Sequence, residues 1–387
     1  MRHARPTKAK SHHRSVAFIG ALLVLLLASS LALGREEEAG SGSYSVTPVA
    51  IINLDDQGRK FKYPSAVFFD PAAREIYVLN NGRGRIIVYG SEFFPRVSLG
   101  AGRQVDTPNG FYVDKNDRLF VCQRRSADKP SRLTILNAAF FLEKEFPLVG
   151  FEEAEVFLPR RVTIGTSGLI YIAADRKGVV VMDQNGQYIR HLTPQDRVLR
   201  DMPKKKEPEE PEAETAETPD LGLPAELLPS RKGPTEEQDS PYALGAVRVI
   251  EVTCGQDGRL YLLSQETSKI YVYDAEEQFL FSFGEKGGST GKMSQPRGMA
   301  LDENKGVIYV VDYMRHTILV YDMPTGKYLF EFGGKGWAPG WFQYPTSLAV
   351  DNKGRLIVAD TFNHRVQVLD VHFKTTSQPE PQTSLPK

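Results

Sequence analysis

Three arginines, Arg160, Arg161 and Arg297, carry side chains that can bind an anion. A guanidinium group presents a planar fork of N–H donors that fits a carboxylate or a phosphate through two hydrogen bonds. Such a site forms only if the fold brings position 297 close to positions 160 and 161. In the alternative interpretation, each arginine is neutralised by a neighbouring acid such as Glu251.

Two histidines, His316 and His364, each follow an aspartate at the same spacing. A zinc site needs three or four ligands, so this pair alone does not make one. His191 and His372 fall late in their repeats, which also argues against a three-histidine centre. We expect His316 and His364 to be turn residues that hydrogen-bond the backbone, and the sequence predicts neither a metal site nor a cofactor.

Four aspartates recur at one position of the repeat described below: Asp70, Asp114, Asp302 and Asp351. A carboxylate in a turn accepts backbone N–H bonds, and repetition favours this structural role because a catalytic residue is needed only once. The chain shows no paired carboxylates, no supported Ser–His–Asp set and no glycine-rich phosphate loop. The sequence therefore predicts no catalytic residues and a protein that is not an enzyme.

Both tryptophans, Trp337 and Trp341, lie in one loop before the last repeat. Aromatic side chains on an exposed face are frequent contact anchors for partners. For Trp341, which precedes Phe342, packing inside the fold is an equally good interpretation.

The elements that must position these residues come from a repeat. The pattern Phe-Gly-x-x-Gly-x-x-x-Gly begins at Phe283 and again at Phe332. Each copy continues into a proline, an alanine and an aspartate at the same spacing: Pro296, Ala300 and Asp302, then Pro345, Ala349 and Asp351. A period of roughly 40 to 50 residues with β-rich runs and turn glycines is typical of a repeat array.

Six apolar and aromatic runs follow turn residues and predict the second strand of each unit. They begin at Ile76, Leu119, Ile170, Leu260, Ile308 and Leu356. The longest interval contains residues 201–240, an acidic, proline-rich segment without aromatic residues, which indicates a disordered loop. Each unit offers four strands, so the sequence predicts an all-β, six-bladed propeller.

The last unit is short of one strand, and an apolar segment at 46–54 precedes the first unit. We infer that this N-terminal strand completes the final blade and closes the ring, which removes exposed sheet edges.

The repeat, followed by Asp360-Thr-Phe-Asn-His-Arg365, resembles the NHL-repeat family of six-bladed propellers. The resemblance covers roughly residues 45–373 and is strongest in the last two blades. Gly165 and Gly255 stand where the other units have the turn aspartate. The family implies a fold rather than one activity, because its members include binding scaffolds, sensor domains, RNA binders and a few lyases.

In propellers, the loops that join fourth to first strands and second to third strands share one face around the mouth of the central channel, where ligands usually bind. The candidate binding residues on this mouth face are Asn109, Arg160, Arg161, Glu251, Arg297, His316, Trp337, Trp341, Thr346 and His364.

The N-terminal segment predicts export. Residues 1–15 form a basic leader, 16–34 an uncharged apolar helix and 35–44 a linker, the pattern of a transmembrane signal-anchor with a cytoplasmic leader. In the alternative, small residues near position 34 permit cleavage of this segment as a signal peptide, which would give a secreted or periplasmic protein. Either way we expect the propeller, residues 45–373, in the periplasm or outside the cell. Residues 374–387 are predicted to be a disordered tail.

Charge and cysteine content restrict the partners further. The chain has 48 basic and 48 acidic residues, and a nearly neutral propeller lacks the electrostatic footprint of a nucleic-acid binder. Cys122 and Cys254 fall in non-adjacent units, in or beside second strands, so we expect two buried thiols rather than a disulfide.

These features favour a non-catalytic scaffold or sensor that binds protein partners in the envelope of a bacterium and contacts the membrane through its N-terminal helix. The alternative is a propeller that binds a small molecule or anion, with lyase or hydrolase activity at the channel mouth around Arg160, Arg297, His316 and His364.

Overall fold

The structure, a computed structural model, describes residues 44–199 and 242–373, which form β-strands joined by turns and short 3₁₀ helices. The predicted leader (1–15), apolar helix (16–34), acidic loop (201–240), tail (374–387) and all of the linker except Tyr44 lie outside the described residues. Within the described ranges, no helix has the length and apolar character to cross a membrane.

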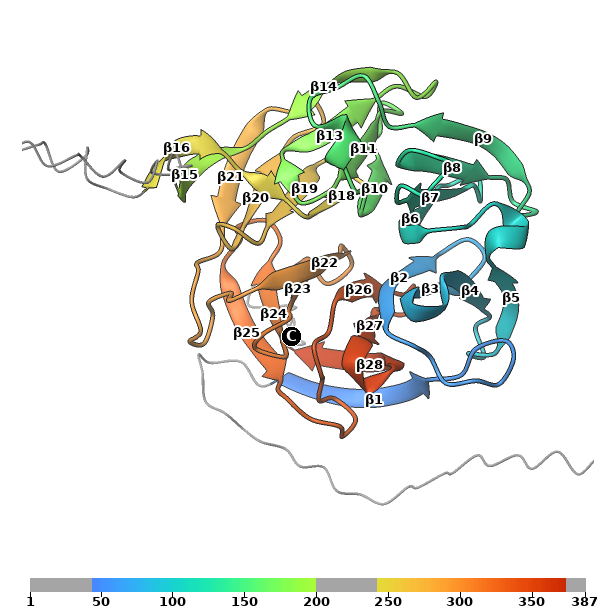
Figure 1. Cartoon of the computed structure of the whole chain (residues 1–387). Helices are drawn as coiled ribbons and strands as arrows, with labels where there is room; N and C mark the ends of the chain where they lie inside the picture. The colour runs from blue at the N-terminus through green and yellow to red at the C-terminus, as the bar shows by residue number, and fades with distance from the viewer. Residues whose placement is uncertain (1–43, 200–241, 374–387) are drawn as a thin grey trace, which may run out of the picture. The chain divides into compact units, whose positions relative to one another are not determined.

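Six antiparallel four-stranded sheets stand around a common axis, in chain order (Figure 1). Blade one contains β2 (Pro64–Asp70), β3 (Glu75–Asn80), β4 (Arg85–Tyr89) and β5 (Pro95–Leu99). Blade two contains β6 (Pro108–Val113), β7 (Leu119–Gln123), β8 (Arg132–Leu136) and β9 (Leu142–Pro147). Blade three contains β10 (Arg161–Ile164), β11 (Ile170–Ala173), β13 (Val179–Met182) and β14 (Tyr188–Leu192). Blade four contains β18 (Glu251–Cys254), β19 (Leu260–Ser264), β20 (Lys269–Tyr273) and β21 (Phe279–Phe283). Blade five contains β22 (Pro296–Asp302), β23 (Val307–Asp312), β24 (Thr317–Asp322) and β25 (Tyr328–Gly333). Blade six contains β26 (Ser347–Val350), β27 (Arg355–Asp360), β28 (Arg365–Phe373) and β1 (Tyr44–Ile52).

The prediction of an all-β, six-bladed propeller with four-stranded blades is confirmed. All six predicted second strands are present, as β3, β7, β11, β19, β23 and β27. Second and third strands are apolar on both faces because each blade packs between two neighbours. Each large apolar cluster of the described residues accordingly combines two adjacent blades.

Two additional strand pairs between blades three and four were not predicted. β12 (Arg176–Lys177) pairs with β17 (Arg248–Val249), and β15 (Gln195–Leu199) pairs with β16 (Tyr242–Ala246) on either side of residues 200–241. The Asp196 carboxylate accepts a hydrogen bond of 2.6 Å from the Tyr271 hydroxyl and pairs with the Lys269 ammonium at 2.8 Å. These contacts attach the β15–β16 hairpin to blade four.

β1 is the outer strand of blade six and pairs antiparallel with β28, from Tyr44 opposite Phe373 to Ile52 opposite Val366. This pairing joins the two ends of the described chain. The strand stops at Ile52, before the predicted end at residue 54, because a turn with Asp55 follows. On the inner side, the Tyr44 ring stacks on Phe330 of blade five at 4.4 Å, and its hydroxyl donates to the Glu331 carbonyl at 2.9 Å.

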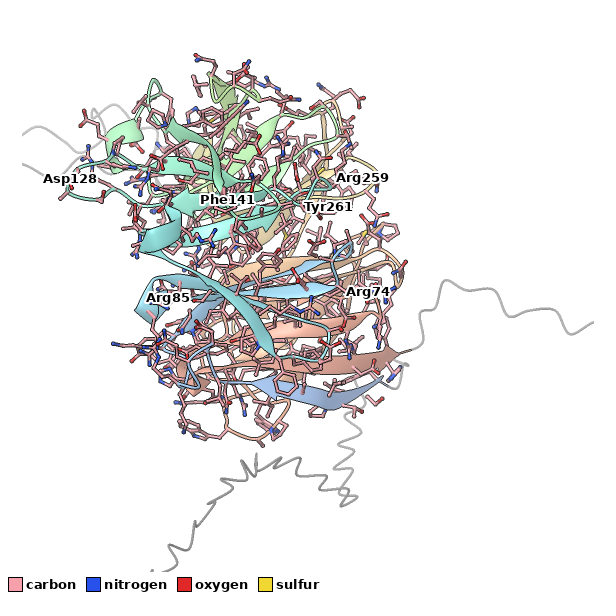
Figure 2. All side chains as sticks on the ribbon, turned by 90° about the vertical axis from the view of Figure 1, so that its right-hand side faces the viewer. Arg74, Arg85, Asp128, Phe141, Arg259 and Tyr261 are labelled. Atoms are coloured by element: carbon pink, nitrogen blue, oxygen red, sulfur yellow. The ribbon has the colours of Figure 1, made fainter. Side chains whose placement is uncertain are left out.

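The propeller has two distinct faces, visible edge-on in Figure 2. Asp128, from the loop between β7 and β8, and Arg85, the first residue of β4, lie at the mouth face. Arg74 and Arg259, from turns between first and second strands, lie at the opposite face. The predicted turn aspartates shape this second set of turns. Asp114, for example, accepts the amides of Asn116 and Arg118, each at 2.9 Å.

We predict that Tyr44→Ala lowers the free energy of unfolding by about 2 kcal/mol, because it removes an aromatic stack and a hydrogen bond between blades. Val49→Ala, in an exposed part of the same strand, is the control and should change it by less than about 0.5 kcal/mol. Denaturant unfolding of the full-length chain measures both. Equal effects of the two substitutions would contradict a role for Tyr44 in ring stability.

Candidate functional site

The first strands of all six blades surround an axial channel with a cavity of 260 Å³. Arg161 and Glu251, which begin their strands, line it towards the mouth face, and Cys254 and Glu303 line it towards the opposite face. Most of the remaining wall is apolar or small: Ala66, Val67, Val162, Met299, Ala300, Leu348 and Ala349 among others. The charged side chains at the mouth therefore decide which ligands the channel accepts.

Arg161 and Glu251 form a buried ion pair between blades three and four, with Nε of Arg161 3.3 Å from Oε1 of Glu251. Burial raises the pKa of Glu251, while the neighbouring Arg161 and Arg160 act in the opposite direction. The pair is incompletely satisfied within the described chain: Nη2 of Arg161 and Oε2 of Glu251 are buried and have no hydrogen-bond partner. The sequence-based alternative, neutralisation by Glu251, thus holds for Arg161.

Arg160 and Arg297 add positive charge to the same mouth. Burial and the charges of Arg161 and Arg297 lower the pKa of Arg160 to about 10. The carboxylates of Glu251 and Asp175 act in the opposite direction and raise this pKa. These mutual effects place the three predicted arginines in one electrostatic environment, and two of them, Arg160 and Arg161, also act on the Glu251 carboxylate. The mouth is therefore cationic.

Two other predicted site residues use their side chains to join blades. The Asn109 amide donates to the Pro159 carbonyl at 2.8 Å. The Thr346 hydroxyl donates to the Ser65 carbonyl at 3.1 Å and lies 2.7 Å from the Thr361 hydroxyl. Both side chains are therefore held by structural hydrogen bonds at the mouth.

The predicted histidines act as expected for turn residues. Nδ1 of His316 accepts the amide of Tyr344 at 2.9 Å, and Nδ1 of His364 accepts the amide of Tyr63 at 3.3 Å. Each bond links one blade to the segment that enters the next. Burial and the charge of Lys335 lower the pKa of His316 below its usual 6.5, which keeps the ring neutral and able to accept.

The two tryptophans differ in their surroundings. Trp337 is 69% exposed, whereas the Trp341 ring packs over the backbone of its own loop, where a Cβ at Gly334 would lie 2.7 Å from Cζ3 of Trp341. The loop itself is fixed by Arg365, which donates to the carbonyls of Trp337 and Trp341 at 2.8 and 2.9 Å.

The sequence did not predict the most extended feature of the mouth face, which we call the aromatic arc: Tyr313, Tyr344, Phe362 and Tyr63. Successive ring centroids lie 4.9, 5.0 and 5.4 Å apart across blades five, six and one. The Arg297 guanidinium lies 4.7 Å from the centre of the Tyr313 ring, so the arc begins at the cationic mouth.

A signal for the arc was present in the sequence. Tyr63 and Tyr344 both precede the proline that leads into a first strand, and both have a left-handed backbone, with φ of 52° and 51°. The sequence shows that Tyr63 and Tyr344 occupy equivalent positions of the repeat. It does not show the angle between blades, which brings the Phe362 ring between the two tyrosine rings.

The cysteines require one correction. Both are free thiols, as predicted, but only Cys122 is fully buried. Cys254, at the end of first strand β18, lies beside Leu260 of the second strand, as expected, and is partly exposed. Burial raises the pKa of both thiols, and that of Cys122 rises to about 12. Among residues 44–199 and 242–373, no group of three or more His, Cys, Asp or Glu side chains is arranged to hold a metal ion.

Family models match two parts of the chain: a 6-bladed beta-propeller model matches residues 244–332, and an NHL repeat model matches residues 342–369. The chain is a six-bladed β-propeller that contains an NHL repeat. No curated protein matches its sequence.

Solved structures share the propeller fold at low sequence identity. A protein of unknown function from Bacteroides thetaiotaomicron has 12% identity and a TM-score of 0.56, with 86% of this chain and 76% of that chain covered. An auxiliary nutrient binding protein from Bacteroides ovatus has 14% identity and a TM-score of 0.55, with 85% and 77% covered. A second auxiliary nutrient binding protein, from Bacteroides thetaiotaomicron, has 12% identity and a TM-score of 0.53, with the same coverage. At these identities the likeness shows the fold alone.

We predict that Glu251→Ala lowers the free energy of unfolding by about 3 kcal/mol, because it leaves the buried Arg161 charge unpaired. The double variant Arg161→Leu with Glu251→Leu should recover most of this loss, since it removes both buried charges. Denaturant unfolding of the two variants tests the prediction, and a double variant less stable than Glu251→Ala would contradict it.

His316 should make stability depend on pH. Because its folded-state pKa lies below the unfolded value, its contribution is present above pH 6.5 and is lost as the pH falls through the folded pKa. The variant His316→Asn keeps a residue that tolerates the left-handed backbone but does not titrate. The stability difference between wild type and variant should be about 1 kcal/mol at pH 8 and shrink below pH 6; a difference independent of pH would disprove the prediction.

Proposed function

We propose that this propeller is a non-catalytic scaffold or sensor that binds an acidic segment of a protein partner on its mouth face. The observation that carries the proposal is the aromatic arc beside the cationic mouth. Phe362 and Tyr63 are 40% and 38% exposed although they contact each other, so the arc presents apolar surface to a partner. Aromatic residues and arginine are the side chains that most often dominate binding energy at protein interfaces.

Charge supplies the second part of the recognition. Arg297 lies at the end of the arc, and Arg160 and Arg161 lie beyond it in the channel mouth. A partner segment with an apolar side chain on the arc and a carboxylate towards the arginines would satisfy both. Complementary charge of this kind mainly contributes specificity and the rate of association.

The absence of catalysis is inferred from how the mouth's polar side chains are used. Asn109, His316, Thr346 and His364 all form hydrogen bonds with the backbone of a neighbouring blade. These bonds give each of the four side chains a structural role between blades, which favours binding over acid–base chemistry at the mouth. The auxiliary nutrient binding proteins that share the fold are compatible with a binding role.

Export is part of the proposal and is supported by the sequence alone. The basic segment 1–15 and the apolar run 16–34 favour a single-pass anchor in the cytoplasmic membrane, with the propeller in the periplasm or outside and its partner in the cell envelope. Cleavage after the apolar run would instead release the propeller into the periplasm or medium.

A small anionic molecule in the channel is the second candidate function. The buried, unpartnered Nη2 of Arg161 favours it, because this guanidinium donor is available at the channel wall. The 260 Å³ cavity is just below the usual range for drug-sized ligands, which suits a small carboxylate.

We predict that Phe362→Ala lowers recovery of the partner at least fivefold in a crosslinked membrane pull-down of the full-length protein, quantified by mass spectrometry. Phe94→Ala is the matched control, because Phe94 is 70% exposed but belongs to a turn between third and fourth strands, away from the arc. Arg297→Ala should reduce recovery more at low salt than at high salt.

Equal recovery of the same proteins with Phe362→Ala and Phe94→Ala would overturn the scaffold proposal. The channel candidate is tested separately by native mass spectrometry, in which an anion that co-purifies with wild type should be lost from the Arg161→Leu, Glu251→Leu variant while partner recovery stays unchanged.

A further inference from the structure

A second and larger cavity, of 680 Å³, lies between blades two and three at the face opposite the mouth. We call it the side cavity. Turns between first and second strands form its opening, through residues 114–118 and 165–168. Its inner wall is made of Tyr112, Phe120, Ile135, Ile164 and Ile170.

This junction differs from the one between blades one and two. Between blades one and two, the second-strand residue Tyr77 meets Phe140, from the turn between the third and fourth strands of the next blade, with ring centroids 6.4 Å apart. Phe120 is the equivalent of Tyr77, but the equivalent turn position in blade three is Gly186. A Cβ there would lie 2.3 Å from the Phe146 ring, so this turn has no room for a side chain.

The inner end of the cavity is lined by apolar side chains, whereas the rest of its lining is polar. Phe120, Ile135 and Ile170 are each only 2% exposed, yet all three line the cavity. A space bounded in this way accepts apolar atoms from a ligand at little cost. The volume falls within the usual range for pockets that hold small molecules.

The rim is positive. It carries Lys115, Arg118 and Lys144. The carboxylate that lines it, Asp114, is bound by Arg118 at 2.7 Å and by turn amides, and Arg118 also lies 3.6 Å from Glu143, so the two lysines carry the unpaired charge. In blade three the turn aspartate of the repeat is replaced by Gly165, which removes the acid that would otherwise face this rim. Neither Lys115 nor Lys144 forms an ion pair within the described residues.

We propose that the side cavity binds a small amphipathic anion, with a flat aromatic body against Phe120 and the isoleucines and one carboxylate or sulfonate at the rim lysines. The Arg118 guanidinium lies 5.4 Å from the Phe120 ring, so the apolar and charged parts of one molecule reach their partners together. Such a site is distinct from the mouth face and does not depend on the proposed partner.

Cys254, which lies in the wall shared by the side cavity and the channel, reports on a ligand bound against that wall. It lines the side cavity and is partly exposed, whereas Cys122 is fully buried, so N-ethylmaleimide should alkylate Cys254 selectively. The probes are 8-anilinonaphthalene-1-sulfonate, an aromatic anion, and its uncharged analogue N-phenyl-1-naphthylamine. Alkylation of the full-length chain is followed by intact mass, and Cys254→Ser verifies the modified position.

Saturating sulfonate should slow alkylation at least tenfold. The double variant Lys115→Gln, Lys144→Gln should raise the half-protecting concentration of the sulfonate about tenfold and change that of the uncharged analogue less than twofold. Lys327→Gln with Lys353→Gln removes two exposed lysines from turns of blades five and six and is the charge-matched control, expected to have no effect.

Unchanged alkylation in the presence of the sulfonate would overturn the proposal. So would protection that is equal for both probes and insensitive to the rim lysines, which would indicate unspecific apolar binding. Phe362→Ala, which tests the mouth face, should leave protection of Cys254 unchanged, so failure of one site does not imply failure of the other.

Discussion

The whole structure depends on how closely the first strands of neighbouring blades approach one another around the axis. At one position of the first strand in blades two and five the backbone of the next blade leaves almost no room: a Cβ at Gly110 would lie 1.8 Å from the Arg160 carbonyl oxygen, and one at Gly298 would lie 2.8 Å from that of Thr346. Ala66 and Ser347 occupy the same position in two other blades, as their pairing with the second strands shows. Small residues there let the blades pack, and the packing in turn sets the width of the channel.

Blades three and four break this rule with Arg161 and Glu251 at the equivalent position. Two long charged side chains now lie in the channel where the other blades have small ones. A buried ion pair is weak support for stability, because desolvation of the two charges offsets most of their attraction. The pair is better explained by what it presents to the channel, a donor and an acceptor without a partner in the described chain. The departure from the repeat therefore coincides with the candidate site.

The sequence predicted what depends on the repeat and missed what depends on contacts between repeats. Periodic second strands, turn aspartates and the histidines at 316 and 364 all follow from local patterns, and their roles could be derived from one blade. The aromatic arc could not, because Tyr63 and Phe362 come from opposite ends of the chain and meet only when the ring is complete. The β15–β16 hairpin was missed for another reason: its strands flank the acidic segment and belong to no repeat.

Regular and irregular blades contribute different surfaces. Blades five, six and one carry the aromatic arc, whereas blades two to four carry the ion pair and the side cavity, where glycine replaces a repeat residue at positions 165 and 255. The two cavities share Tyr112, Cys254 and Gln256 in their walls, so the side cavity and the channel are separated by single side chains. A ligand in the side cavity that moves these three residues also changes the affinity of the channel for its own ligand. By thermodynamic linkage, a ligand in the channel then changes the affinity of the side cavity by the same factor.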